Sequence, residues 1–316
     1  MRFAHFTDLH LPIRARPRVT ALLSKRVLGY QSWLRKRHKR HQQWTLDTLV
    51  ADAKAKGIDG VLVTGDITNI ALPSEFRDAA TWMAEQLTGL PTAFVPGNHD
   101  SYVDLPWADG LGLLDPFMEG WSNLDEAETA APRARTGADD FPFIAPIGLA
   151  QGICCICANS CPPTAPGMAS GRLGDAQIAA LAAILDAAKA RGLYRLVLVH
   201  HPVSDGVVSW RKALHDAPAF QAMIAAHGAD LILHGHTHFP VHASLTGPDG
   251  PVPVLGGGSA SHTAGHGKYT PARYSLLDIA RGDDGRWQTD VTIQELDVAR
   301  KSVHPAREQP WTKAAV

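Results

Sequence analysis

The stretch LILHGHTHFP, residues 231–240, ends an apolar run with three histidines at alternate positions. These are His234, His236 and His238, and Gly235 separates the first two. Neutral imidazole is the commonest metal ligand among side chains, and it also exchanges protons near neutral pH. Several histidines at the end of one buried strand therefore indicate a metal site or a proton relay.

Other apolar runs of strand length also end in polar side chains. The motifs Asp-x-His, Gly-Asp, Gly-Asn-His-Asp and His-His each follow an apolar run. Their polar residues are Asp8, His10, Asp66, Asn98, His99, Asp100, His200 and His201. Carboxylate, amide and imidazole groups suit Mn, Fe, Zn or Ni. Each motif is common by itself, but their shared position after apolar runs indicates one site that binds a pair of metal ions.

The apolar runs alternate with patterns of helical period, which predicts an α/β fold. Helices are expected over residues 46–57, 74–89, 174–192 and 217–228. Strands of near-continuous apolar residues indicate a sheet buried on both faces, with ligands at the carboxyl ends of its strands. Shorter antiparallel strands are expected after Pro251. We expect one domain over residues 1–302 and a loosely held tail over residues 303–316.

With these motifs in this order, the chain resembles the calcineurin-like metallophosphoesterase superfamily, in particular its bacterial dinuclear-metal phosphodiesterases. The resemblance extends from Phe3 to about Asp278. It implies two mixed β-sheets that pack as a sandwich flanked by α-helices. It also implies ligands for two ions: Asp8, His10 and His238 for the first, Asn98, His200 and His236 for the second, and Asp66 as the bridge.

The same resemblance implies the chemistry of the site. Two ions roughly 3.5–4 Å apart would hold a shared hydroxide for in-line attack on phosphorus. His99 matches the family's proton donor to the leaving group, a step typically worth about 10²–10⁴-fold, and Asp100 matches its orienting partner. Purple acid phosphatases carry a tyrosine for ferric iron at the position of Asn69. Two divalent ions are therefore expected here, with manganese favoured.

The remaining histidines and the cysteines have simpler interpretations. His5, His201 and His234 are expected to be buried and hydrogen-bonded, whereas His262 and His266 are candidates for the rim of the site. The four cysteines are Cys154, Cys155, Cys157 and Cys161. Because alternate residues of a strand point to opposite faces, these thiols are poorly placed to chelate one zinc ion. We expect them to act as small buried hydrophobic residues.

The net charge is −1, but the charged residues are unevenly distributed along the chain. Residues 9–46 contain no Asp or Glu but ten of the 30 Lys and Arg residues, so that 20 basic residues face 31 acidic ones elsewhere. We call residues 14–44, which follow Asp8 and His10, the basic insert. Its apolar residues at near-helical spacing are Val19, Leu22, Leu23, Val27, Tyr30 and Leu34. It is either a helical arm packed on the body or a cap that recruits a polyanionic or lipid-bearing substrate.

Candidate substrate-binding residues are Arg35, Lys36, Arg37, Arg211 and His262. Three functions stay open. The first is a phosphodiesterase similar to the family's bacterial cyclic-nucleotide and glycerophosphodiester hydrolases. The second is a peripheral membrane hydrolase of a lipid-linked pyrophosphate, similar to the UDP-2,3-diacylglucosamine pyrophosphatases. The third is a non-catalytic scaffold, which the filled ligand positions disfavour.

The composition of 45% apolar and 19% charged residues is ordinary for a soluble globular protein. No apolar run approaches the roughly 18 residues of a membrane span, and the N-terminus lacks a signal-peptide core. A cytoplasmic protein is therefore expected, with peripheral contact at the inner membrane face if the basic insert binds anionic lipid. A nucleic-acid substrate is disfavoured, because the chain outside the basic insert is acidic. The oligomeric state stays open.

Overall fold

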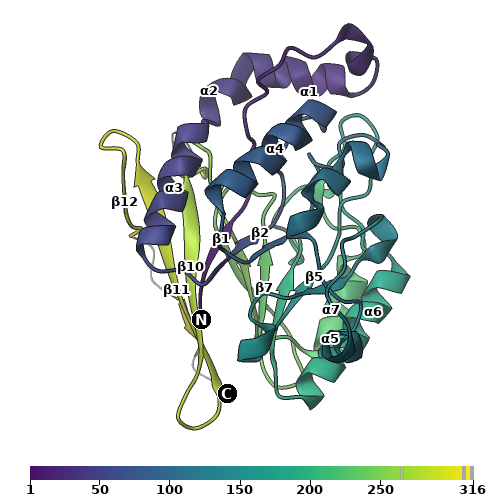
Figure 1. Ribbon diagram of the computed structural model, residues 1–316, viewed down its shortest axis with the longest axis vertical. Coiled ribbons are helices and arrows are strands. Elements are labelled where there is room, and N and C mark those ends of the chain that lie inside the picture. Colours follow the sequence, from purple (N-terminus) through teal and green to yellow (C-terminus); the bar gives the residue numbers. More distant parts are fainter. Residues whose placement is uncertain (264, 266, 308–310, 314–316) are drawn as a thin grey trace.

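Two β-sheets form the centre of the computed structural model (Figure 1), which describes residues 1–263, 265, 267–307 and 311–313. The first sheet has the order β12-β11-β10-β1-β2-β3, and β13 pairs with β11. The second sheet has the order β4-β5-β6-β7-β9-β8. The strands of the first sheet are β1 Arg2–Phe6, β2 Gly60–Val63, β3 Thr92–Phe94, β10 Arg273–Arg281, β11 Trp287–Asp297, β12 Ser302–Pro305 and β13 Trp311–Lys313. Those of the second are β4 Phe143–Ala145, β5 Ile153–Cys157, β6 Tyr194–Leu198, β7 Leu231–His234, β8 Val241–Leu245 and β9 Val252–Gly256.

Each sheet has parallel strands in its interior and antiparallel strands toward at least one edge. Strand β1 pairs parallel with β2, and β2 with β3, whereas β10 pairs antiparallel with β1. In the second sheet β5, β6, β7 and β9 are parallel, and β4 and β8 are antiparallel edges. Both sheets are therefore mixed, and the loops after their parallel strands supply the polar residues predicted from sequence.

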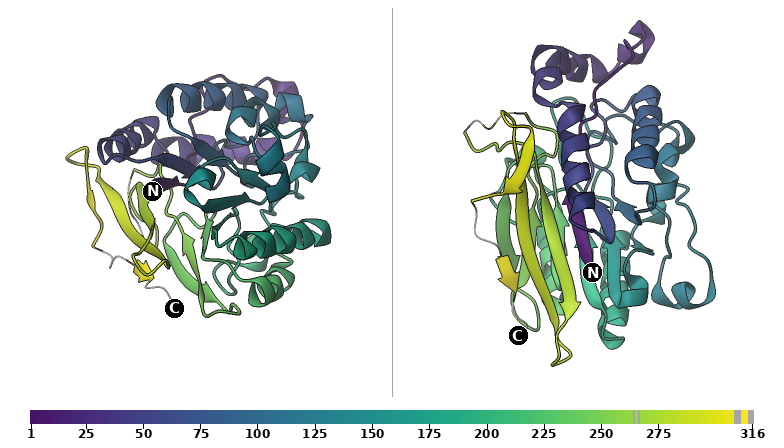
Figure 2. Two further views of the ribbon diagram at one scale, coloured as in Figure 1. Left: turned by 60° about the horizontal axis from the view of Figure 1, so that its bottom comes forward. Right: turned by 60° about the vertical axis from the view of Figure 1, so that its left-hand side comes forward.

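Helices cover the outer face of each sheet (Figure 1 and Figure 2). The helices are α1 Arg26–Ser32, α2 His38–Arg40, α3 Gln43–Ala55, α4 Pro73–Gln86, α5 Leu124–Thr129, α6 Asp175–Ala190 and α7 Ala217–His227. Leu49 of α3 and Phe76 of α4 share a buried core with Leu62 of β2. A second core joins Leu181 of α6 and Phe220 of α7. The predicted α/β fold of two mixed sheets flanked by helices is confirmed.

The predicted boundaries differ from the structure in two places. Helix α3 begins at Gln43, three residues before the expected start, and so includes the last two residues of the basic insert. The second place is the start of the expected tail. Residues Ser302–Pro305 form strand β12, in which Val303 pairs with Leu296 of β11. A strand this short is defined by its pairing partner and gives little signal of its own.

The basic insert is helical and lies at one end of the two sheets (Figure 1). It consists of a 3₁₀ turn at Val19–Leu22, α1, a π-helical turn at Trp33–Arg37, and α2. Leu22, Tyr30 and Trp33 pack against a small buried cluster of the body. One part of the predicted apolar stripe is thus an attachment to the body.

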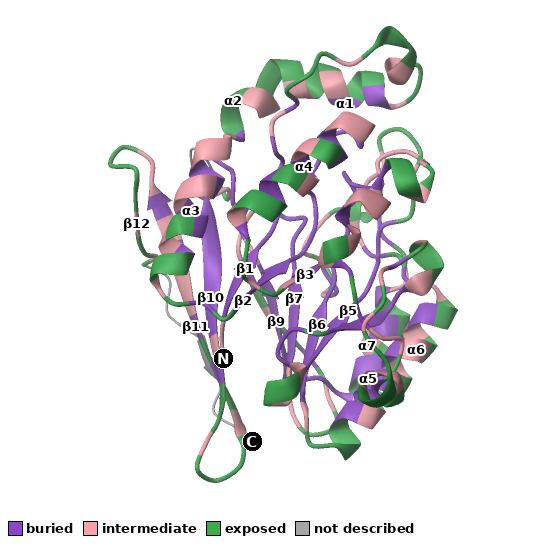
Figure 3. Ribbon diagram, in the orientation of Figure 1, coloured by how far each residue is buried: buried purple, intermediate pink, exposed green. Residues whose placement is uncertain are grey.

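The other part of that stripe is open to solvent (Figure 3). The described chain has six exposed large hydrophobic residues, and five of them lie in the basic insert. These five are Val19, Leu23, Val27, Leu28 and Leu34, with exposed fractions between 40% and 80%. The basic insert therefore carries most of the exposed large hydrophobic residues of the described chain.

The cysteine run forms the buried strand β5. All four cysteines are free thiols and buried. Cys155 and Cys157 belong to one hydrophobic core and Cys154 to the other, so the run faces both sides of its sheet. The prediction that the cysteines are small buried residues is confirmed. Among the described residues, no helix has the length and apolar character needed to cross a membrane.

Candidate metal centre

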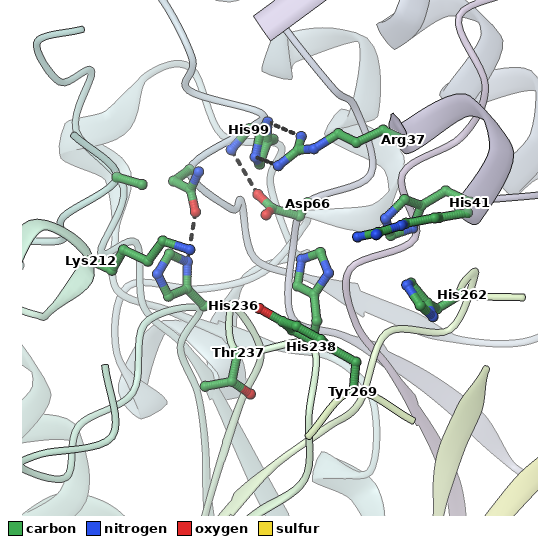
Figure 4. Close-up of a pocket in the computed structure, with 13 residues that line it drawn as sticks. Arg37, His41, Asp66, His99, Lys212, His236, Thr237, His238, His262 and Tyr269 are labelled. Atoms are coloured by element: carbon green, nitrogen blue, oxygen red, sulfur yellow. Dashed lines mark hydrogen bonds between the residues drawn. The ribbon is translucent and has the colours of Figure 1, made fainter. Parts of the chain in front are cut away.

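The loops after β1, β2, β3, β6 and β7 meet at one end of the two sheets, and several of their residues are drawn in Figure 4. The residues they bring together are Asp8, His10, Asp66, Asn98, His99, Asp100, His200, His236 and His238. All of them are buried except His238, which is partly exposed. Residues separated by more than 200 positions in the sequence therefore share one small polar site.

The backbone at this site has an unusual conformation. Asp8, His10, Asp66, His236 and His238 have positive φ angles between 41° and 70°. Only two other non-glycine residues of the described chain have positive φ. Such conformations cost about 1–3 kcal/mol each and persist where the surrounding structure determines them. The surrounding structure therefore holds these five residues in a backbone conformation that is locally unfavourable.

One group of side chains surrounds the end of β1. The ligand atoms of Asp8, His10, Asp66 and His238 all lie within 4.8 Å of one another. His238 Nε2 is 3.1 Å from Asp8 Oδ1 and 3.2 Å from His10 Nε2. Two oxygens and two nitrogens at this spacing can bind one divalent cation.

A second group lies on the other side of Asp66. Asn98 Oδ1 is 2.7 Å from His236 Nδ1 and 3.2 Å from His200 Nε2. Asp66 Oδ2 lies 3.6 Å from His200 Nε2 and 3.8 Å from His10 Nε2, one nitrogen from each group. A single carboxylate thus stands between two sets of potential ligands.

The hydrogen bonds around these imidazoles fit metal binding. His10 Nδ1 contacts the carbonyl oxygen of Thr68 at 3.0 Å, and His200 Nδ1 contacts that of Thr64 at 2.7 Å. A carbonyl only accepts, so in both rings Nδ1 carries the proton and Nε2 has a lone pair, within 4 Å of Asp66 Oδ2. Asp8 Oδ1 is buried and lies 3.1 Å from His238 Nε2. Each of these atoms is left with unused capacity for a cation.

The electrostatics of Asp66 lead to the same conclusion. Burial raises the pKa of Asp66 well above its usual range, and the nearby carboxylates of Asp8 and Asp100 raise it further. Three acidic groups this close repel one another unless positive charge is added. Burial also lowers the pKa of His236 well below its usual value, which keeps the imidazole neutral and able to act as a ligand.

His99 is fixed beside Asp66. Its backbone N–H donates to Asp66 Oδ1 at 2.7 Å, and its Nδ1 donates to the carbonyl oxygen of Asn69 at 2.5 Å. Its Nε2 accepts from Arg37 Nη2 at 2.8 Å. Burial, followed by the charge of Arg37, lowers the pKa of His99 well below its usual value. The side-chain amide of Asn69 donates to the carbonyl of Leu11 at 2.7 Å.

The expected contact between Asp100 and the ring of His99 is not among the described interactions. The Asp100 carboxylate accepts hydrogen bonds from the backbone N–H groups of residues 66, 67, 68 and 97. Burial raises its pKa to about 6. Asp100 therefore holds the loop that carries Asp66, and the carbonyl of Asn69 orients His99. Which residue orients His99 depends on where the side chains point, and the adjacent sequence positions of His99 and Asp100 do not show this.

A cavity of about 240 Å³ opens over Asp66 and His236 (Figure 4). Of the predicted substrate-binding residues, Arg37 and His262 line it. Arg35, Lys36 and Arg211 do not line the cavity and are exposed. Consecutive residues of a helical turn point in different directions, so only one of the arginines and lysines at positions 35–37 faces inward.

Six residues of this cavity were not predicted from the sequence: Arg40, His41, Ala169, Lys212, Thr237 and Tyr269. Arg40 and His41 lie near the end of the basic insert, and Lys212 directly follows the predicted Arg211. For these three residues the available signal was their place within or beside segments already selected. His266 lies outside the described residues. His5, His201 and His234 are buried as expected; His5 Nε2, for example, is 2.8 Å from Thr64 Oγ1.

The glycine of the motif His-Gly-His has a steric role. A Cβ atom at Gly235 would overlap Thr7 Oγ1 and lie 3.0 Å from Asp8 Oδ2. The end of β7 therefore packs directly on the end of β1, and only glycine permits that approach. This contact brings the two sheets close enough to combine their ligands.

The whole sequence pattern also identifies the family. The chain matches the family model for calcineurin-like phosphoesterases over residues 1–240. It belongs to the calcineurin-like phosphoesterase family. This family member is a metal-dependent phosphoester hydrolase, and the family implies a dinuclear divalent metal centre.

Several solved structures share the fold. A dimetal phosphatase from Danio rerio matches with a TM-score of 0.56 and 14% identity over 98% of both chains. A purple acid phosphatase from yellow lupin (Lupinus luteus) seeds matches with a TM-score of 0.55 and 12% identity, over 98% of this chain and 53% of that one. The NAD nucleotidase of Haemophilus influenzae has a TM-score of 0.50 and 14% identity, over 98% of this chain and 54% of that one. No curated protein sequence matches significantly.

Proposed function

We propose that this phosphoesterase is a phosphodiesterase that uses two divalent ions, with manganese preferred. The proposed ligands are Asp8, His10 and His238 for one ion, Asn98, His200 and His236 for the other, and Asp66 for both. When bound, the ions supply an activated water and neutralise charge that develops on the phosphoryl group. The observation that carries the proposal is the position of Asp66 Oδ2, between the Nε2 lone pairs of His10 and His200.

His99 is the proposed general acid. Because Asn69 holds Nδ1, the nitrogen available to protonate a leaving oxygen is Nε2. Arg37 contacts that nitrogen at 2.8 Å in this structure. A phosphoryl group in the cavity would draw the guanidinium toward its own oxygens, since charge-assisted hydrogen bonds to phosphate are stronger than one to a neutral imidazole. Substrate binding would then release the Nε2 lone pair, which would take up a proton from water beside the phosphoryl charge, and the resulting imidazolium would donate that proton to the leaving oxygen.

The rim of the cavity supports a diester in preference to a monoester. Arg37, Arg40 and Lys212 offer positive charge to the non-bridging oxygens. His262 and Tyr269 stack with ring centres 6.3 Å apart and provide a flat aromatic surface beside them. The second ester substituent of a diester would use this surface, and a monoester has no such group.

A substrate panel tests this proposal. Bis-p-nitrophenyl phosphate, p-nitrophenyl phosphate, cyclic AMP and a nucleotide-sugar pyrophosphate would each be assayed with Mn, Mg, Zn and Ni. We expect the highest kcat/KM for a diester with manganese, and loss of activity with a chelator. A strong preference for the monoester would overturn the diesterase assignment, and full activity after chelation would overturn the metal centre.

The exposed apolar residues of the basic insert favour a second candidate function, the hydrolysis of a lipid-linked pyrophosphate at an anionic membrane. Leu23 and Leu28 are 80% and 54% exposed within a segment that has no acidic residue. Apolar side chains flanked by arginine and lysine are typical of helices that lie in a membrane interface. Each basic residue near such a surface contributes about 1 kcal/mol of attraction. The same segment carries Arg37 into the cavity, so a docked substrate headgroup would enter from the membrane side.

Co-sedimentation with vesicles separates the two functions. The test compares phosphatidylglycerol-containing vesicles with purely zwitterionic ones, at low and high salt. We expect binding to anionic vesicles that falls with salt and is lost in Leu23→Asp. The matched control is Ala190→Asp, which adds the same charge at the exposed end of α6. No binding to anionic vesicles would exclude the lipid-linked function and leave the soluble diesterase.

A further inference from the structure

His41 is a buried histidine of the basic insert that lies against the proposed metal ligands. It follows α2 in an extended conformation, and its side chain sits at the edge of the cavity (Figure 4). It is 5% exposed. Its ring centre is 4.7 Å from that of His10 and 5.5 Å from that of His238. Nothing in the seven-residue ligand set explains why a further imidazole is buried there.

The nitrogen atoms of His41 are placed as those of a ligand would be. The ligand atoms of His10, His41 and His238 all lie within 4.8 Å of one another. This group shares two members with the group formed by Asp8, His10, Asp66 and His238. His41 therefore lies beside His10 and His238 at the first cation position, and the carboxylates of Asp8 and Asp66 lie farther from it.

The hydrogen bonds of His41 define which nitrogen is available. Its Nδ1 is 2.7 Å from Ser261 Oγ. The Ser261 hydroxyl donates to the carbonyl oxygen of Asp8 at 3.2 Å, so its lone pair accepts from a protonated His41 Nδ1. In the described structure the Nε2 of His41 makes no hydrogen bond, and in this tautomer it carries a lone pair. A hydrogen-bonded Nδ1 that orients a free Nε2 is the usual arrangement of a metal-bound histidine.

The backbone holds this side chain in position from two directions. His41 forms a β-bridge with His262, and the N–H of Gln42 donates to the carbonyl of Ser261 at 3.0 Å. The basic insert is therefore fastened to the loop after β9 at the residue that faces the metal ligands.

We propose that His41 is an additional ligand, through Nε2, of the ion held by Asp8, His10 and His238. The inference depends on the dinuclear centre described above but not on the choice of a diester substrate. It makes the basic insert part of the metal site, so that loss of the ion loosens the insert. His41 is grouped with His10 and His238 and not with Asn98, His200 and His236, the proposed ligands of the other ion.

Two substitutions distinguish ligation from a purely structural role. Asparagine places its amide near the position of Nδ1 and retains the hydrogen bond to Ser261, but it has no atom at the position of Nε2. Glutamine places its amide oxygen near the position of Nε2 and can still bind a cation. Ligation predicts that His41→Asn is the weaker metal binder, whereas a structural role through Ser261 predicts that His41→Gln is the more damaged variant.

The experiment titrates metal-free protein with Mn²⁺ by calorimetry and with Co²⁺ by visible absorption. His38→Ala is the matched control: His38 belongs to α2, and its Nδ1 contacts the carbonyl of Trp33 at 2.9 Å. In His41→Asn we expect one of the two ions to bind at least about tenfold more weakly, with a stronger visible band as the coordination number of Co²⁺ falls. His41→Gln should lie closer to the wild type, and His38→Ala should match it.

Equal affinity for both ions in His41→Asn and the wild type would overturn the assignment, as would a weaker affinity in His41→Gln than in His41→Asn. These results differ from a failure of the metal centre itself. In that case the wild-type protein would bind neither Mn²⁺ nor Co²⁺ in the same titrations.

Discussion

Replacing Asp66 by asparagine should change the stability of the metal-free and metal-loaded proteins in opposite directions. Asp66 is 1% exposed, and its Oδ1 accepts the backbone N–H of His99. Asparagine can keep that hydrogen bond. It also removes one of three buried carboxylates and directs an N–H₂ group toward the lone pairs of His10 and His200. The metal-free variant should therefore be at least as stable as the metal-free wild type.

The loaded protein should behave in the opposite way. An ion present at a thousand times its Kd stabilises the folded state by about 4.1 kcal/mol. Removing even a residue that only orients a ligand typically weakens binding 10–100-fold, and Asp66 lies against both ligand groups. At hundredfold weaker binding the same concentration contributes only about 1.4 kcal/mol, a loss of about 2.7 kcal/mol. For a chain of this size that corresponds to roughly 4 °C in Tm.

Thermal unfolding followed by circular dichroism, with a chelator and with saturating Mn²⁺, measures both effects. The control is Asp283→Asn, which removes an exposed carboxylate in the turn between β10 and β11 and should shift neither curve. A variant Asp66→Asn that kept the full metal-induced rise in Tm would refute the role of Asp66 at the centre. A metal-free variant much less stable than the metal-free wild type would refute the argument from carboxylate repulsion.

Three further outcomes are expected. His99→Ala should lower kcat by about 10²–10⁴-fold while elemental analysis still finds both ions; loss of the ions would contradict its role as general acid. Gly235→Ala should lower the free energy of unfolding in urea by about 1–3 kcal/mol, because the added Cβ overlaps Thr7. Gly137→Ala, where a Cβ meets nothing within 4 Å, should leave that free energy nearly unchanged. Burial raises the pKa of the Cys154 thiol to about 12, and all four cysteines are buried. The native protein should therefore react with a disulfide reagent at pH 8 far more slowly than the unfolded protein. Rapid labelling of four thiols in the native protein would contradict their burial.

The fold class and the set of polar residues at the strand ends could be read from the sequence. Apolar runs of strand length each end in residues such as Asp8, Asp66 and His236, and parallel strands of an α/β sheet bring such ends together. The helices α3, α4, α6 and α7 likewise follow from local periodicity. These features depend on residues that are neighbours along the chain, so the sequence carries their signal directly.

The finer roles at the site depended on side-chain direction. Positions 99 and 100 are adjacent, yet His99 faces Asn69 and Arg37 while the Asp100 carboxylate binds backbone N–H groups. In the same way Lys212 lines the cavity and its neighbour Arg211 does not. Local φ and ψ angles and packing determine such choices, and no spacing rule in the sequence encodes them.

The arrangement of the basic insert depends on tertiary packing. Its composition indicated an apolar and cationic segment, but not that Leu22 and Tyr30 would pack on the body while Leu23 and Leu28 stay in water. Nor did it indicate that His41 would pair with His262, 221 positions along the chain, and approach His10. Contacts over such distances are determined by how the two sheets pack. The residue types along the chain therefore set which ligands are available, and the packing of distant segments sets which of them meet.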